Sequence, residues 1–346
     1  MLDDLQVIKQ KDPADTLGAV MAVPEQASYE VVVEQGAHEP REIRNIVLAG
    51  MGGSALAAEM IKALTNGWLH VPLTIVKGYD VPGFANDYSL VIAISHSGNT
   101  EETLSCYQQA IEKGAQVAVM STGGKLLDMA TQDDVPYVQV PTGSQPRMST
   151  TYHLRGLLKL LTHFSVIDAD LYDQVAASAD WLRQELAAWA ADVPEERNYA
   201  KQLAKLVAGK TPVFYGGELT WPLAYKCKIS WNESAKNLAF YNQYPEFNHN
   251  EFIGWSSHPI EKPFVVFDLC SDLERPRIRE RMELSDRLLS GMRPKAQTLE
   301  LCGDTLLKQL LWGLALADMA SIYTGILNGV NPEPVELVER LKKELS

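Results

Sequence analysis

Short apolar runs alternate with helical segments between residues 43 and 140 of the chain. The apolar runs are Ile43–Ala49, Leu73–Val76, Leu90–Ile94, Gln116–Met120 and Tyr137–Val140. Between them lie segments with helical composition, such as Ala55–Thr65 and Thr100–Lys113, the latter with Glu101 and Glu102 in its first turn. Strands of about five residues alternating with helices of about 10–15 are typical of a parallel sheet covered by helices. This alternation therefore predicts an α/β fold.

The same pattern returns after a helical stretch at residues 148–193. A strand is expected at Thr211–Tyr215, followed by Gly216-Gly217 and a helix at Trp221–Ile229; a strand at Phe264–Leu269 then precedes a charged helix at Arg275–Leu289. A long apolar helix at Leu306–Leu327 and a short one at Pro334–Leu345 end the chain. The repeat predicts two three-layer α/β/α domains, each with a mainly parallel sheet, at residues 1–155 and 156–346.

Composition excludes several classes of partner. The net charge of −13 and the scattered Lys and Arg residues argue against nucleic acid and anionic membranes. No 18 apolar residues run together, and the N-terminus is too polar for a signal peptide. The four cysteines form no C-x-x-C pair or Cys/His cluster, so reduced, mostly buried thiols and no metal site are expected. These features favour a cytoplasmic protein.

A candidate anion site follows the strand Leu90–Ile94, where the sequence reads Ser95-His96-Ser97-Gly98-Asn99-Thr100. The start of the following helix offers backbone N–H groups, and Ser95, Ser97 and Thr100 add three hydroxyls within one turn. The alternative without a ligand is an ordinary helix N-cap with a glycine turn. The similar Gly52-Gly53-Ser54 segment after an earlier strand favours a phosphate site, to which all six of these residues would contribute.

Four longer motifs extend this interpretation: VLAGMGGSALAAE, AISHSGNTEETL, STGGKLLDMA and PTGSQPR. With KISWNESAKNLAFYNQYPEFNHNEFIGW and GVNPEPVELVERLKKEL further on, nearly the whole chain resembles the sugar isomerase (SIS) fold, and more narrowly the bifunctional phosphoglucose/phosphomannose isomerase family. The resemblance implies interconversion of glucose 6-phosphate and fructose 6-phosphate through a cis-enediolate, without a cofactor. It also implies a homodimer.

The resemblance assigns four catalytic residues, each of which has an ordinary structural alternative. Glu233 of the NES motif would be the base that carries the proton, rather than a solvated carboxylate at a helix end. His249, between Asn248 and Asn250 that could fix its tautomer, would open and close the sugar ring from the partner subunit. Arg147 would stabilise the enediolate, rather than being a surface cation. Lys342, near the C-terminus, would assist ring opening.

Two positions depart from the family pattern, and the chemistry leaves alternatives open. His96 replaces a tyrosine that is usual between the two loop serines, and Glu333 stands where a threonine is common. Because that threonine is linked to rotation about C2–C3, activity towards mannose 6-phosphate is in doubt. A sugar-phosphate deglycase or amino-sugar phosphate enzyme would reuse the same loop, Glu and His. A sugar-phosphate-sensing regulator is disfavoured because no basic DNA-binding domain accompanies the repeat.

Overall fold

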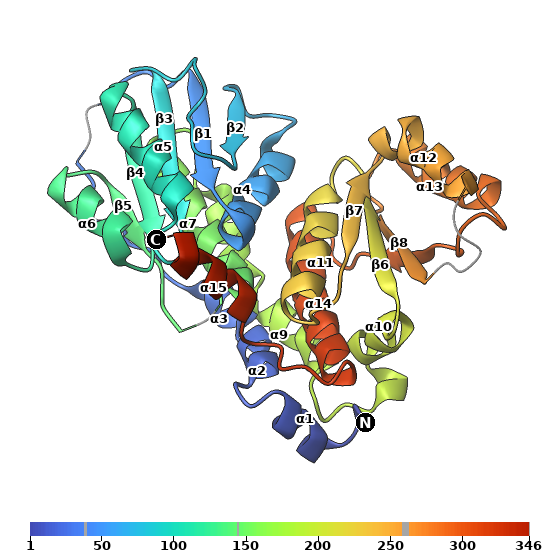
Figure 1. The fold of residues 1–346 in the computed structure, drawn as a ribbon. Helices are drawn as coiled ribbons and strands as arrows, with labels where there is room; N and C mark the ends of the chain where they lie inside the picture. The colour runs from blue at the N-terminus through green and yellow to red at the C-terminus, as the bar shows by residue number, and fades with distance from the viewer. Residues whose placement is uncertain (38–39, 144, 258–262, 346) are drawn as a thin grey trace. The chain divides into compact units, whose positions relative to one another are not determined.

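The structure is a computed structural model that describes residues 1–37, 40–143, 145–257 and 263–345. The chain forms two compact units (Figure 1). The first unit comprises Pro24–Asp180, and the second comprises Met1–Val23 together with Trp181–Ser346. Each unit contains a parallel sheet with helices on its faces, so the predicted fold class is confirmed.

The limits of the two units differ from the expected ranges 1–155 and 156–346. Helix α7 (Thr150–His163) runs through the expected boundary and packs on α4 and β4 of the first unit. The N-terminal residues join the second unit, where Lys201 Nζ donates to Asp3 Oδ1 at 3.1 Å. The helical composition of residues 148–193 contained no signal for where one unit ends.

The described residues of the first unit form a five-stranded sheet of order β2-β1-β3-β4-β5, with every neighbouring pair parallel. Its strands are β1 (Asn45–Gly50), β2 (Leu73–Val76), β3 (Ser89–Ser95), β4 (Gln116–Ser121) and β5 (Tyr137–Gln139). Its helical segments are α3 (Val23–Ser28), α4 (Gly52–Thr65), α5 (Glu101–Glu112), α6 (Gly124–Gln132), η1 (Pro146–Met148), α7 and α8 (Asp170–Ala177).

Both faces of this sheet are covered, which explains the continuous apolar runs in its strands. Val47, Val91 and Val119 pack in one cluster with side chains of α5 and α6. Helices α4 and α7 pack together, and α7 lies against β4, where Gly156 leaves room for the Met120 side chain. The unit therefore has the three layers expected from the sequence.

The second unit has a four-stranded parallel sheet of order β7-β6-β8-β9 within the described residues. Its strands are β6 (Thr211–Gly216), β7 (Phe240–Gln243), β8 (Phe264–Cys270) and β9 (Gln297–Glu300). Its helical segments are α1 (Leu5–Lys11), α2 (Thr16–Met21), η2 (Glu195–Arg197), α10 (Tyr199–Val207), α11 (Trp221–Glu233), η3 (Glu246–His249), α12 (Glu251–Gly254), η4 (Trp255–Ser257), α13 (Pro276–Leu288), α14 (Leu306–Leu327) and α15 (Glu336–Leu345); α9 (Ala179–Ala187) begins at the unit boundary. β7, β9 and α10 were not expected from the sequence.

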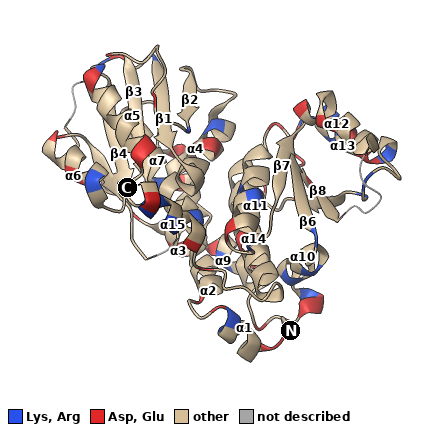
Figure 2. Cartoon of the chain, in the orientation of Figure 1, with Lys and Arg blue, Asp and Glu red and all other residues tan. Residues whose placement is uncertain are grey.

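Helix α14 is the central core helix of the second unit. Among the described residues it alone is long and apolar enough to cross a membrane, judged by length and composition, but 94% of its most apolar stretch is buried inside the protein. It packs against α10 and α11. Cys106, Cys227 and Cys270 are buried, Cys302 is partly exposed, and none of the four forms a disulfide. Figure 2 shows acidic and basic residues interspersed over the helices of both units.

A buried ion pair joins α11 to α14. Lys226 Nζ lies 2.7 Å from Asp318 Oδ1, and both side chains are inaccessible to solvent. Ser230, one turn further along α11, donates to the same carboxylate oxygen at 2.8 Å. Because Asp318 is bonded by two successive turns of α11, it fixes the axial position of the helix that ends at Glu233.

We expect Asp318→Ala to lower the free energy of unfolding by about 3–5 kcal/mol, because it leaves the Lys226 ammonium buried and without its counterion. The double variant Lys226→Met/Asp318→Leu should lose much less, since it removes both charges. Urea denaturation followed by circular dichroism measures both. A double variant as unstable as Asp318→Ala would contradict this account.

Candidate functional site

Two glycine-containing loops follow neighbouring strands of the first sheet. β1 leads through Gly52 into α4, and β3 leads through residues 96–100 into α5. β1 and β3 are neighbours in the sheet. From β1 the chain continues to β2 on one side of this pair, and from β3 it continues to β4 on the other side. The carboxyl ends of β1 and β3 are thus a topological switch point, where open α/β sheets bind their ligands.

The loop after β3 is held by its own polar groups. Ser95 Oγ lies 2.8 Å from Thr100 Oγ1 and accepts the Gly98 N–H at 3.1 Å. Gly98 has a φ of +70°, and a Cβ there would lie 1.7 Å from Gly123 O. Only glycine fits this position, because any side chain would collide with the backbone of the loop after β4.

Neither helix at this edge is capped in the ordinary way. Met51 and Thr100, the N-cap residues of α4 and α5, make no capping hydrogen bond with their side chains. Thr100 points its hydroxyl at Ser95 instead. The first N–H groups of two helices are therefore left without a side-chain cap at one sheet edge, which is the electrostatic arrangement that favours an anion. The N-cap alternative is not what the structure shows.

The predicted serine ligands differ in their surroundings. Ser97 is exposed and Thr100 is half-buried, whereas Ser54 and Ser95 are buried. Ser54 Oγ accepts the backbone N–H of His96 at 3.1 Å, which ties the two loops together. Ser54 and Ser95 thus organise the loops, and Ser97 presents its hydroxyl at the surface.

A third loop, after β4, supports the site and was missed as a functional element. Thr122 donates its N–H at 3.1 Å and its hydroxyl at 2.6 Å to the carbonyl of His96. Leu126 N–H donates to Gly98 O at 2.9 Å. The motif STGGK marks this loop in the sequence, but nothing local reveals that it braces the loop after β3.

Arg147 lies beside the first loop. Its side chain is fully buried, so it is not a surface cation. A Cβ built on Gly53 would come within 3.0 Å of Arg147 N, which shows how closely the Gln-Pro-Arg turn approaches the start of α4. Arg147 therefore lies in the same unit, and at the same loop, as the candidate anion site. Ser144, in the same motif, lies outside the described residues.

His96 meets a second histidine at this edge. Its Nδ1 lies 3.1 Å from Nε2 of His153, in the first turn of α7, and the rings are edge-to-face with centroids 5.3 Å apart. Burial, with a smaller contribution from His96, lowers the pKa of His153 to about 3. His153 is therefore neutral at pH 7, and the sequence had given no reason to single it out.

Glu233 is the last residue of α11 and is half-buried. The turn that follows is bonded to the C-terminal segment: Lys236 Nζ donates to the carbonyls of Glu233 at 2.5 Å and of Pro332 at 3.1 Å. Asn328 Nδ2 donates to Ala235 O at 3.1 Å. The Glu233 turn and the segment that leads to Glu333 are therefore neighbours, a relation that their separation in sequence conceals.

His249 and Glu233 lie at opposite ends of the strands of the second sheet, His249 at the carboxyl ends and Glu233 at the amino ends. α11 begins beyond the carboxyl end of β6 and returns antiparallel to it, so Glu233 is near the amino edge, whereas η3 follows the carboxyl end of β7. A helix of 13 residues is about 20 Å long. One chain does not bring these two side chains together.

The expectation that Asn248 and Asn250 fix the tautomer of His249 is wrong. The Asn248 amide bonds with Ser285 Oγ and Arg281, and Asn250 Nδ2 donates to Glu246 Oε1. These side chains instead hold η3 against α13 and cap α12. His249 is exposed on η3. Lys342 is also exposed, on α15, and pairs with Glu339 at 2.8 Å.

At the second Gly-Gly loop the backbone N–H groups bond with a side chain of the protein, that of Glu274. Glu274 Oε1 accepts the N–H groups of Leu219 at 2.7 Å and Thr220 at 3.2 Å, at the start of α11. A Cβ on Gly217 would lie 2.2 Å from this oxygen. Burial raises the pKa of Glu274. Its carboxyl group occupies the place that an external anion takes at a free helix start.

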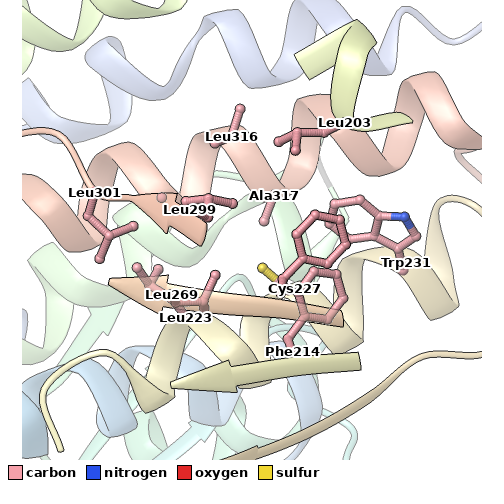
Figure 3. A pocket seen from close by; sticks show the side chains of 12 residues that line it. Leu203, Phe214, Leu223, Cys227, Trp231, Leu269, Leu299, Leu301, Leu316 and Ala317 are labelled. Carbon is pink, nitrogen blue, oxygen red and sulfur yellow. The ribbon is translucent and has the colours of Figure 1, made fainter. Parts of the chain in front are cut away.

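The enclosed hollow of the second unit is not a functional site. It lies between the second sheet and the helices α11 and α14 and is lined by apolar side chains with Cys227 and Trp231 (Figure 3). Its volume is about 10 Å³, less than a single water needs to bind comfortably. Among the described residues no three His, Cys, Asp or Glu side chains are grouped to hold a metal.

Comparisons with known proteins agree with this geometry. Residues 196–345 match the model of the bacterial phospho-glucose isomerase C-terminal SIS domain. A bifunctional phosphoglucose/phosphomannose isomerase from Caldicellulosiruptor bescii is 32% identical over 88% of this chain and 90% of its own length. A D-glucosamine-6-phosphate 4-epimerase from Sulfolobus acidocaldarius is 30% identical over 70% of this chain and 74% of its own. A glucose-6-phosphate isomerase like protein from Thermus thermophilus has a similar fold, with TM-score 0.65 and 18% identity, over 99% of this chain and 98% of that one.

We expect Ser97→Ala/Thr100→Ala to weaken binding of inorganic phosphate about 10²- to 10⁴-fold, because each of the two lost hydrogen bonds to a charged group contributes about 1.5–3 kcal/mol. Calorimetric titration with phosphate measures the loss. The matched control is Thr131→Ala on α6, an exposed threonine of the same unit. Unchanged phosphate affinity in the double variant would disprove the assignment of this loop.

Proposed function

Since the chain belongs to the bifunctional phosphoglucose/phosphomannose isomerase family, we propose that it interconverts glucose 6-phosphate and fructose 6-phosphate. The observation that carries this proposal is the pair of helix starts without side-chain caps at the switch point of the first sheet. They supply backbone donors for a phosphate dianion in a protein whose net charge is −13. The sugar phosphate is thus bound locally, without a basic surface.

The chemistry requires one base and a stabilised oxyanion. In the open-chain aldose, Glu233 removes the proton from C2 and returns it to C1, while the hydroxyl proton of O2 passes to O1, which leaves the carbonyl at C2. The cis-enediolate between these steps carries negative charge on oxygen, and Arg147 is the cation that we assign to it. Support for Glu233 comes from its place at the end of a helix anchored by Asp318, and support for Arg147 from its burial beside the Gly53 loop.

His249 is proposed to open and close the sugar ring in the active site of a partner subunit. Glu233 ends α11, a helix about 20 Å long that begins at the carboxyl end of β6, whereas η3 with His249 follows the carboxyl end of β7; this separation supports a contribution from a second copy rather than from the same chain. A homodimer follows from this assignment. Lys342 is proposed to assist the same step, and the reduced thiols and acidic surface support a cytoplasmic location.

An amino-sugar phosphate enzyme is the second candidate, favoured by the similarity to a D-glucosamine-6-phosphate 4-epimerase. Such an enzyme would use the same phosphate loops. Glu333, in the segment beside that turn, replaces the threonine common in the family, so we expect turnover of mannose 6-phosphate to be slower than that of glucose 6-phosphate.

We expect the purified protein to convert fructose 6-phosphate to glucose 6-phosphate in the presence of EDTA, because an enediolate mechanism with a carboxylate base does not itself require a metal. Coupling to glucose-6-phosphate dehydrogenase measures the rate. Turnover of glucosamine 6-phosphate, with none of fructose 6-phosphate, would favour the amino-sugar alternative instead.

Glu233→Gln should lower kcat by about 10²–10⁴-fold, the usual contribution of a general base, while the affinity for fructose 6-phosphate changes little. The rate comes from the coupled assay and the affinity from calorimetry. The matched control, Glu283→Gln on the exposed face of α13, should keep the wild-type rate. A Glu233→Gln enzyme that retains most of its activity would rule out this base.

A further inference from the structure

The segment that carries His249 is too short to hold its own shape. η3, α12 and η4 comprise four, four and three residues, and isolated helical turns of this length are unstable in water. His249 ends η3 and is exposed. Its position must therefore come from side-chain contacts between this segment and the rest of the second unit.

Glu251 makes the contacts with the sheet. Its Oε1 accepts a hydrogen bond from the phenol of Tyr215 on β6, and its Oε2 accepts one from Nδ2 of Asn242 on β7 at 2.7 Å. Tyr215 and Asn242 lie opposite each other in the parallel register of these strands. A single half-buried carboxylate, two residues beyond His249, thus bonds with two neighbouring strands at once.

The surrounding groups fix the direction of both bonds. Burial, and after it the charge of Glu251, raises the pKa of the Tyr215 phenol, which therefore stays protonated and donates. Trp255, in η4, donates its Nε1–H to the same phenol oxygen at 3.2 Å. Asn242 uses its Oδ1 to accept the Gln243 N–H at 2.8 Å, so its Nδ2 is the group that donates to Glu251. Both oxygens of Glu251 therefore act as acceptors.

A second anchor lies on the other side of His249. The Asn248 amide donates to Ser285 Oγ at 2.8 Å and accepts from Arg281 Nη1 at 3.2 Å, both on α13. The chain is thus bonded to α13 at Asn248 and, three residues later, to the sheet at Glu251. The backbone at His249 is held from both sides, while its side chain stays exposed.

We propose that Glu251 is a positioning residue for His249: its carboxylate, bonded to Tyr215 and Asn242, holds η3 so that the imidazole reaches the sugar ring in the partner subunit. The proposal rests on the role given to His249 under the proposed function. Ring opening breaks the bond between the anomeric carbon and the ring oxygen and moves the proton of the anomeric hydroxyl to that oxygen. The imidazole that carries this proton must be held within hydrogen-bond reach of both oxygens.

A reciprocal exchange of the two side chains tests the contact. Glu251→Gln leaves one acceptor oxygen for two donors, and Asn242→Asp sets two carboxylates against each other, so each should lower kcat for fructose 6-phosphate about 10- to 100-fold through misplacement of His249. The double variant Asn242→Asp/Glu251→Gln restores the bond with donor and acceptor exchanged, and it should recover most of the rate. Losses that simply add in the double variant would contradict the proposal.

Hybrid dimers test what the contact is for. A dimer of one Glu233→Gln chain and one His249→Asn chain, purified through two different affinity tags, has one intact site of two and should show about half the wild-type rate. A Glu251→Ala chain should be restored in the same way by a Glu233→Gln chain, but not by a His249→Asn chain. The control is Glu246→Gln, an exposed carboxylate of the same segment whose replacement can still accept from Asn250, and it should keep the wild-type rate.

The hybrids separate the two proposals. Inactive hybrids of Glu233→Gln with His249→Asn refute the role of His249 in the partner subunit, and the role of Glu251 with it. Active hybrids of that pair, with Glu251→Ala restored by both partners or by neither, refute only the positioning role. If Glu251→Ala does not fold, Asn242→Asp, which leaves residues 246–257 unchanged, takes its place in the hybrids and is judged by the same outcomes.

Discussion

The side-by-side placement of β1 and β3 is the constraint on which the candidate site depends. The chain leaves β1 towards one side of the sheet and β3 towards the other, so the starts of α4 and α5 come to the same edge. Their N–H groups converge there, and the glycines at 53 and 98 let the Pro146-Arg147 turn and the loop after β4 approach within contact distance. The polar side chains of these loops then bond mainly with one another, and we propose that the helix starts bind an anion.

The second sheet repeats this arrangement with the opposite result. β6 and β8 are neighbours, and Gly216-Gly217 precedes α11 as Gly52-Gly53 begins α4. In the second unit, however, the Glu274 carboxylate accepts the N–H groups of Leu219 and Thr220, just before α11 begins. An internal carboxyl group thus bonds with backbone donors in front of α11, whereas the N-cap residues of α4 and α5 make no side-chain capping bond. The base that we propose, Glu233, lies at the end of α11 rather than at its start.

Much of this could be predicted from the sequence because the relevant signals are local. Buried strands give continuous apolar runs, and Leu73–Val76 and Leu306–Leu327 were predicted to the residue. β7 and β9 were missed because they are edge strands with several exposed positions, and neither shows a sustained apolar run. The loops were identifiable because glycine and serine cluster after strands. The bond of Ser54 to His96, the brace from Thr122 and the His96–His153 contact join distant segments, and no local pattern encodes them.

The position of Glu233 shows why residue type and spacing could suggest a catalytic role without explaining it. The sequence places Glu233 16 residues before His249, which suggests proximity, but the intervening chain runs along the length of β7, so that Glu233 precedes this strand and His249 follows it. What holds Glu233 is instead Asp318, 85 residues further on, through Lys226 and Ser230, and Lys236, which joins the Glu233 turn to Pro332. A base that moves a proton between two adjacent carbons must be held to within a fraction of an ångström. The buried ion pair between α11 and α14 therefore fixes the position of the carboxylate that we propose as the base, which gives a reason for a charged pair in the middle of an otherwise apolar helix contact.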